Sequence, residues 1–71
     1  MTKFYLKTEY IELCKLLKIT SMVLSGAEAK DVISQELVFV NEKIETRKRY
    51  KAIQGDVIRY NERIITICAE D

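Results

Sequence analysis

The chain has 71 residues, enough for one small domain and too few for large enzyme folds such as a TIM barrel or a two-half dinucleotide-binding domain. Hydrophobic residues make up 48% and charged residues 32%, a balance typical of a folded domain and not of a disordered tail. The net charge is +1 and histidine is absent, which removes the commonest general base at neutral pH and the commonest metal ligand. We therefore expect a single domain over residues 1–71, without catalytic residues, cofactor or bound metal.

The N-terminal part of the sequence predicts a strand and then a helix. Residues 3–7 are rich in aromatic side chains and indicate a short strand or an ordered arm. Thr8 is a candidate N-cap. Apolar residues recur from Tyr10 at i, i+3, i+4 and i+7, which predicts the first helix over about residues 9–18.

A second helix is predicted by a local N-terminal signal. Ser25 and Glu28 have the spacing of a capping box, in which the serine hydroxyl accepts from the Glu28 N–H and the glutamate reaches back to the Ser25 N–H. Ala29, Val32 and Ile33 then form an apolar stripe, so the helix is expected over about residues 26–35. Lys30 lies off that stripe and is expected to point outward.

The remaining sequence predicts four short strands. Residues 37–40 and 43–45 flank Asn41 and Glu42, which suggests a hairpin. A type I′ turn there would place Glu42 at positive φ at a cost on the order of 1 kcal/mol, so a longer loop or another turn type stays open. Residues 57–60 and 63–68 flank a second tight turn at residues 61–62. The order strand, helix, helix and four strands indicates an α+β fold.

A run of residues rich in lysine and arginine lies before the last two predicted strands. Residues 43–51 carry five basic side chains against one acidic, a net charge of +4, whereas the rest of the chain carries seven against ten, a net of −3. The densest part is Arg47, Lys48, Arg49, Tyr50 and Lys51, which combines charged groups for phosphates with an aromatic ring for stacking. Such a run is also typical of a solvated loop. Because it lies between predicted strands that would hold it on a rigid scaffold, we interpret it as a candidate RNA-binding loop.

Several motifs together resemble a known family. They are Leu13-x-x-Leu16-Leu17-Lys18, Ser25-Gly26-Ala27-Glu28-Ala29-Lys30, Val38-x-Val40-Asn41, Glu45-Thr46-Arg47-Lys48-Arg49 and Gly55-Asp56-Val57-Ile58. Over residues 8–67 the chain resembles the RNA-binding domain named after small-subunit ribosomal protein S-four, and most of all its small stand-alone bacterial members, the YbcJ-like and YaaA-like proteins. The resemblance implies two helices packed on a small, bent antiparallel sheet of about four to five short strands.

The resemblance also implies a binding face. In this family the second helix and the loop after the hairpin present basic groups to structured RNA, often ribosomal RNA or tRNA. By position this nominates Ser25, Gly26, Lys30, Arg47, Lys48, Arg49 and Lys51, with Tyr50 as a residue that either stacks on a base or packs on the sheet. Many members have arginine where this chain has Gly26, and Arg-Leu-Asp where it has Tyr10-Ile11-Glu12, so phosphate-binding charge is missing at both places.

We therefore expect a non-catalytic RNA-binding protein that is associated with the ribosome or its assembly. We also expect it to be a monomer and to have no small-molecule substrate. No run approaches the ~20 apolar residues of a membrane span, and no signal-peptide core is present, so we expect a cytoplasmic protein. Cys14 and Cys68 are expected to be reduced thiols. Two alternatives stay open: a protein-interaction module that docks an acidic partner, and an accessory domain for an RNA-modifying enzyme. Whether Lys15 and Lys18 join the binding face also stays open.

Overall fold

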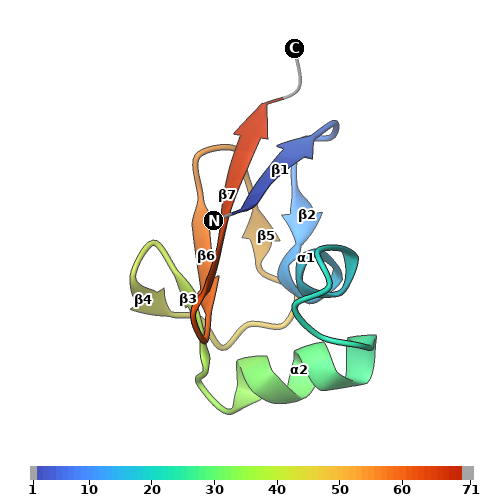
Figure 1. Cartoon of the computed structure of the whole chain (residues 1–71), viewed down its shortest axis with the longest axis vertical. Coiled ribbons are helices and arrows are strands. Elements are labelled where there is room, and N and C mark those ends of the chain that lie inside the picture. The colour runs from blue at the N-terminus through green and yellow to red at the C-terminus, as the bar shows by residue number, and fades with distance from the viewer. Residues whose placement is uncertain (1, 70–71) are drawn as a thin grey trace.

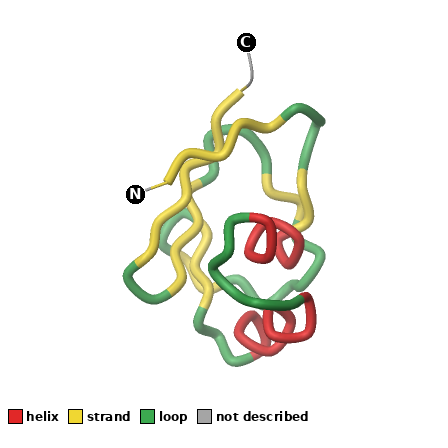
Figure 2. Tube along the Cα trace, turned by 45° about the vertical axis from the view of Figure 1, so that its right-hand side comes forward, coloured by secondary structure: helices red, strands yellow, loops and turns green. Residues whose placement is uncertain are grey.

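The computed structural model describes residues 2–69 and contains two helices beside a five-stranded sheet (Figure 1). The sheet has the order β1-β7-β6-β3-β4. Its strands are β1 (Thr2–Leu6), β3 (Val38–Val40), β4 (Lys43–Ile44), β6 (Val57–Tyr60) and β7 (Arg63–Ala69). A separate pair of short strands, β2 (Ile11–Glu12) and β5 (Lys51–Ala52), lies next to the first helix. The helices α1 (Leu13–Ile19) and α2 (Gly26–Ser34) lie together on one side of the strands (Figure 2).

The predicted α+β class with two helices on a small sheet is confirmed, with two differences in the strands. The sheet is mixed, because β1 pairs in parallel with β7, whereas the other pairs of this sheet are antiparallel. The pairing of β2 with β5 was not predicted, and it joins Ile11 to Ala52 and Glu12 to Lys51. Both pairings connect segments roughly 40 to 60 residues apart, so local sequence patterns carry no signal for them.

The predicted start of the first helix is wrong by four residues. The helix begins at Leu13, and Ile11 and Glu12 form β2 instead. Thr8 is not the N-cap, because its hydroxyl donates to the Tyr10 carbonyl at 2.7 Å. The apolar residues keep helical spacing from Tyr10 onward. However, Ile11 and Glu12 pair with β5 in an extended conformation, so the helix begins only after them.

The second helix matches its prediction, except in the detail of its cap. The Ser25 hydroxyl accepts from the Glu28 N–H at 3.1 Å, as predicted. The Glu28 carboxylate accepts from the Leu24 N–H at 2.7 Å, one residue earlier than a standard capping box requires. The cap therefore ties the connector between the helices to the first turn of α2.

Both helices end in the same motif without a glycine. At the end of α2, Glu36 has φ 65°, and the N–H groups of Glu36 and Leu37 donate to the carbonyls of Ile33 and Val32. This pattern is a Schellman motif, in which the left-handed position is usually glycine. At the end of α1 the left-handed position is Ser21, with φ 60°.

The first hairpin adopts the strained turn that the sequence left open. Asn41 and Glu42 have φ values of 52° and 70°, and Val40 pairs with Lys43, so two residues at positive φ form the loop as in a type I′ turn. The Asn41 side chain compensates, because its carbonyl accepts from the Val57 N–H at 2.9 Å. The turn is thus held against the start of β6.

The core lies between the helices and the sheet. Leu13, Leu16 and Leu17 are fully buried on α1, at the i, i+3 and i+4 spacing of one helical face. They belong to one cluster with apolar residues of α2 and of every strand of the larger sheet except β4. The remaining buried members are Leu6, Val23, Ala29, Val32, Ile33, Val38, Val40, Ala52, Ile58, Ile65 and Ile67. Because Leu13, the first residue of α1, is among the fully buried residues, the core fixes the end of the helix that the basic segment contacts.

Candidate nucleic-acid interface

Residues 45–50 connect β4 to β5, and we refer to them together with Lys51, the first residue of β5, as the basic segment. Backbone hydrogen bonds attach it to α1, since the Leu13 N–H donates to the Tyr50 carbonyl at 2.9 Å and the Cys14 N–H to the Lys48 carbonyl at 3.2 Å. These carbonyls replace the side-chain cap that α1 lacks. The first turn of the helix therefore fixes the backbone of the segment at the point where its cations lie.

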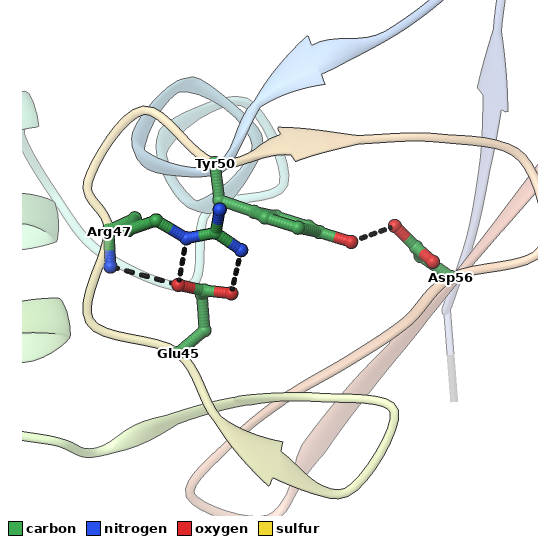
Figure 3. A network of polar contacts seen from close by, with 4 residues as sticks. All are labelled: Glu45, Arg47, Tyr50 and Asp56. Atoms are coloured by element: carbon green, nitrogen blue, oxygen red, sulfur yellow. Dashed lines mark hydrogen bonds and ion pairs between the residues drawn. The ribbon is translucent and has the colours of Figure 1, made fainter.

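Arg47 is held by a carboxylate within the same segment (Figure 3). Its Nε and Nη2 atoms donate to the two Glu45 carboxylate oxygens at 2.9 and 3.0 Å, and its backbone N–H donates at 3.0 Å. The hydrogen bonds from Arg47 lower the pKa of Glu45, and the same pairing raises the pKa of Arg47. The Arg47 side chain is still 72% exposed, against 13% for Glu45, so the outer edge of its guanidinium faces solvent.

Tyr50 connects the segment to the only buried charged residue in the part of the chain that the structure describes. Its hydroxyl donates to Asp56 Oδ2 at 2.8 Å, and its ring packs against the core (Figure 3). Burial, followed by the hydrogen bond and charge of Asp56, raises the pKa of Tyr50 to about 12. Asp56 also accepts from the Ile53 N–H at 3.1 Å and from the Asn41 amide at 3.0 Å. Of the two roles left open for Tyr50, the geometry therefore favours packing over stacking.

The other cations of the segment lie at the surface. Lys48, Arg49 and Lys51 are all exposed. Lys51 Nζ lies 5.0 Å from the centre of the Tyr10 ring, and the Arg47 guanidinium lies 5.1 Å from that of Tyr50. These contacts orient two of the four cations over aromatic faces.

The residues of α2 that were predicted to bind RNA lie on the helix next to α1, which the basic segment contacts. Ser25 caps α2, Gly26 is its first residue, and Lys30 is exposed on it. They are connected to the basic segment through α1, which packs against α2. A side chain at position 26 would meet open space, so glycine is not required there by packing.

Of the two lysines left open, Lys15 lies at the same end of α1 as the basic segment. It is the third residue of the helix, and its ammonium lies 3.9 Å from Glu12 Oε1. Lys18 is exposed in the last turn, at the opposite end of the helix. Position therefore favours Lys15 over Lys18 as an addition to the interface.

Sequence reasoning missed three residues that shape this region: Tyr10, Glu45 and Asp56. Glu45 lies in a predicted strand and in one of the family motifs but is given no role there, although an acid two residues before an arginine is within reach of a local ion pair. The sequence carries no signal for the burial of Asp56, because its 7% exposure depends on partners brought together by the fold. Tyr10 was placed inside a helix, where it would have faced the core.

The acidic and cysteine side chains of residues 2–69 form no metal site. In that range no three His, Cys, Asp or Glu side chains come together in a group that could hold a metal ion. Cys14 and Cys68 are free and half-buried. No helix of the described range is long and apolar enough to cross a membrane.

Comparison with known proteins shows which family of proteins has this fold. Residues 4–68 match the S4 domain family, and the chain belongs to that family. It is 41% identical over 54 residues to YbcJ of Escherichia coli, which is named as a candidate RNA-binding protein, and to an uncharacterised YbcJ of Shigella flexneri; each match covers 76% of this chain and 77% of the relative.

The solved structures include a relative with the same fold. The solution structure of YbcJ from Escherichia coli superimposes with a TM-score of 0.75 at 37% identity, covering 97% of this chain and 89% of the other. That structure is described as revealing a motif involved in RNA binding. The resemblance inferred from the sequence motifs is thereby confirmed.

Proposed function

We propose that this protein is a non-catalytic RNA-binding module that contacts structured RNA, such as ribosomal RNA or tRNA, and acts in ribosome assembly. The observation that carries the proposal is the basic segment, whose exposed cations are fixed to the N-terminal end of α1 by backbone hydrogen bonds. Membership of the S4 domain family and the RNA-binding descriptions of its relatives support the same function. The absence of histidine from the sequence supports a role without acid–base catalysis.

The proposed contact residues differ in the work they do. Lys48, Arg49 and Lys51 bind phosphates directly, because their charges are exposed. Arg47 offers a phosphate only the edge of its guanidinium that Glu45 leaves uncovered, and the Glu45 charge offsets its own. Recognition then depends on RNA shape, since side chains cannot read the deep major groove of A-form RNA.

The second helix extends the proposed interface. Lys30 supplies one more exposed charge, and Ser25 and Gly26 begin the helix at which the RNA backbone passes. Tyr50 belongs to the interface as a support for Arg47 and not as a stacking surface.

The test is a binding titration against total bacterial tRNA and fragments of ribosomal RNA at several salt concentrations. With four to five phosphates neutralised, log K should fall with log salt at a slope of roughly −3 to −4, from ~0.7–0.9 per contact. The double variant Lys48→Gln and Arg49→Gln should flatten that slope by about 1.5 and weaken binding to all these RNAs alike.

A matched control removes the same charge elsewhere. Lys3 and Lys18 are exposed on β1 and in the last turn of α1, and changing both to glutamine should leave most of the slope in place. Equal binding by the Lys48/Arg49 variant and the wild type would exclude the basic segment as the RNA site. A partner captured from cells that survives nuclease treatment would instead favour an acidic protein partner.

A further inference from the structure

An open hollow lies between the end of β1 and the first turn of α1. It encloses about 540 Å³, within the ~300–1,000 Å³ typical of small-molecule sites. Its lining residues are Thr8, Glu9, Tyr10, Ile11, Glu12 and Lys15. The hollow adjoins the basic segment, because β2 in its wall pairs with β5 and the next residue, Leu13, donates to the Tyr50 carbonyl. An RNA strand that follows the segment would therefore pass its mouth.

The hollow contains the aromatic surface that the basic segment lacks. Tyr10 is 42% exposed and lines the hollow. The Lys51 ammonium covers one face of its ring at 5.0 Å from the ring centre. A base can stack on an exposed tyrosine ring, and a neighbouring cation can hold the phosphate attached to that base. Tyr50 offers no comparable surface, because its half-buried ring packs against the core while Arg47 lies over it, and Asp56 holds its hydroxyl.

The charges around the hollow suit a base better than a phosphate. Two carboxylates, Glu9 and Glu12, line it and would repel an anion. Lys15 lies 3.9 Å from Glu12 and offsets its charge, so Glu9 is the exposed carboxylate that remains. A carboxylate has two acceptor oxygens, which match two adjacent N–H donors on one partner.

We propose that this hollow binds one unpaired base of the RNA, with guanine preferred. The base stacks on Tyr10, and its N1–H and N2–H groups donate to the two oxygens of Glu9. Lys51, which lies over the same ring, holds the phosphate attached to that base. Guanine is preferred because it has two adjacent donors on its Watson–Crick edge, whereas uracil has one. This inference rests on the proposed RNA-binding function, and it specifies which part of the RNA the hollow binds.

The test uses three fluorescently labelled RNA hairpins with the same stem. One stem is uninterrupted, one contains a single unpaired guanosine and one a single unpaired uridine. The wild type should bind the guanosine hairpin at least fivefold more tightly than the uridine hairpin, and the uridine hairpin more tightly than the uninterrupted stem. Equal affinity for all three would overturn the inference.

Substitution of Tyr10 separates stacking from charge. Tyr10→Ala should weaken binding of the guanosine hairpin by about 5- to 100-fold without changing the salt slope, because no phosphate contact is lost. Tyr10→Phe should bind like the wild type. The matched control is Tyr5→Ala, since Tyr5 is 55% exposed on β1 and outside the hollow. A folded Tyr10→Ala variant with wild-type affinity, checked by circular dichroism, would overturn the inference.

Substitution of Glu9 tests the base preference. Glu9→Gln removes a negative charge near the RNA and should strengthen binding of the uridine hairpin and of the uninterrupted stem. It should also reduce the ratio between the guanosine and uridine hairpins by about fivefold or more, because the bidentate acceptor is lost. An unchanged ratio would exclude Glu9 as the base contact.

Failure of this inference differs from failure of the proposed function. If the wild type binds none of the hairpins, nor tRNA, the proposed function itself is wrong. If the wild type binds with a steep salt slope while Tyr10→Ala keeps the wild-type affinity and Glu9→Gln keeps the wild-type ratio between the guanosine and uridine hairpins, the basic segment is the whole interface and only the hollow is excluded.

Discussion

At the scale of single residues, the basic segment is organised by acids as much as by bases. Glu45 holds Arg47 through both carboxylate oxygens, and Asp56 holds Tyr50 through its hydroxyl. The two pairs are connected, because the Arg47 guanidinium lies over the Tyr50 ring. A chain of four side chains therefore fixes the segment before any RNA arrives, which lowers the entropy lost on binding.

Tyr50→Phe tests this network. The folded-state pKa of Tyr50 is about 12 against an unfolded value of 10.0, so the folded protein holds the phenol proton more tightly. The resulting stabilisation is complete below pH 10 and is lost as the pH rises towards 12. In the phenylalanine variant this alkaline loss should disappear. At neutral pH the variant should be less stable by about 1–2 kcal/mol, since a hydrogen bond to a buried carboxylate is removed.

Urea unfolding at neutral and alkaline pH measures both effects, and tyrosinate absorbance follows the ionisation. Tyr5→Phe is the control, because Tyr5 is exposed and should change stability by less than about 0.5 kcal/mol. If Tyr50 ionises near pH 10, the hydrogen bond to Asp56 does not persist in solution.

At the scale of elements, most of the left-handed backbone positions are occupied by residues other than glycine. Ser21 and Glu36 end the two helices, and Asn41, Glu42 and Asn61 lie in the hairpin loops, all with φ between 52° and 70°. Gly55 is the only glycine with positive φ among residues 2–69. Asn tolerates this conformation, whereas glutamate does so at a cost, so Glu36 and Glu42 carry local strain.

Glu36→Gly should stabilise the protein by about 0.5–1 kcal/mol. The gain from relieving a left-handed residue, ~1–2 kcal/mol, exceeds the entropy that glycine adds to the unfolded chain, ~0.4–1 kcal/mol. Ser34→Gly is the matched control: it places glycine two residues earlier, inside the last turn of α2, and should destabilise by ~0.5–1 kcal/mol. Thermal unfolding distinguishes the two, and equal losses in both variants would contradict the Schellman assignment.

At the scale of the whole molecule, one small core supports everything else. The fully buried leucines of α1 lie in the centre of that core, and the same helix anchors the basic segment through its first two N–H groups. Stability and binding geometry therefore depend on one short helix. A chain of this size buries only ~60% of its unfolded surface, so its margin is small.

Leu16→Ala should cost about 2–5 kcal/mol, because it removes a fully buried side chain and leaves a cavity. That is a large share of the ~5–15 kcal/mol typical of a whole domain, so the variant should melt far below the wild type. Leu24→Ala is the control, since Leu24 is 92% exposed and should change stability by less than about 0.5 kcal/mol. A small loss from Leu16→Ala in denaturant titration would show that the core repacks around the gap.

The sequence alone predicted those features that depend on residues close together along the chain. The Ser25 cap, the apolar stripe of α2 and the two hairpin loops depend on residues close in sequence, and the sequence predicted all of them. The motifs also identified the family, and the density of charge identified the basic segment. These features are local or depend on combined spacing, which a single chain records directly.

The tertiary structure alone decided the rest. The start of α1, the parallel pairing of β1 with β7 and the pairing of β2 with β5 depend on partners far along the chain. The same holds for Asp56, which becomes a buried acceptor only when Asn41 and Tyr50 meet it. Tyr10 changed from an expected core residue to an exposed ring because β5 holds the adjacent Ile11 in a strand. Long-range pairing overrides a local helical pattern, since the hydrogen bonds and buried area it supplies outweigh the small differences in helix propensity.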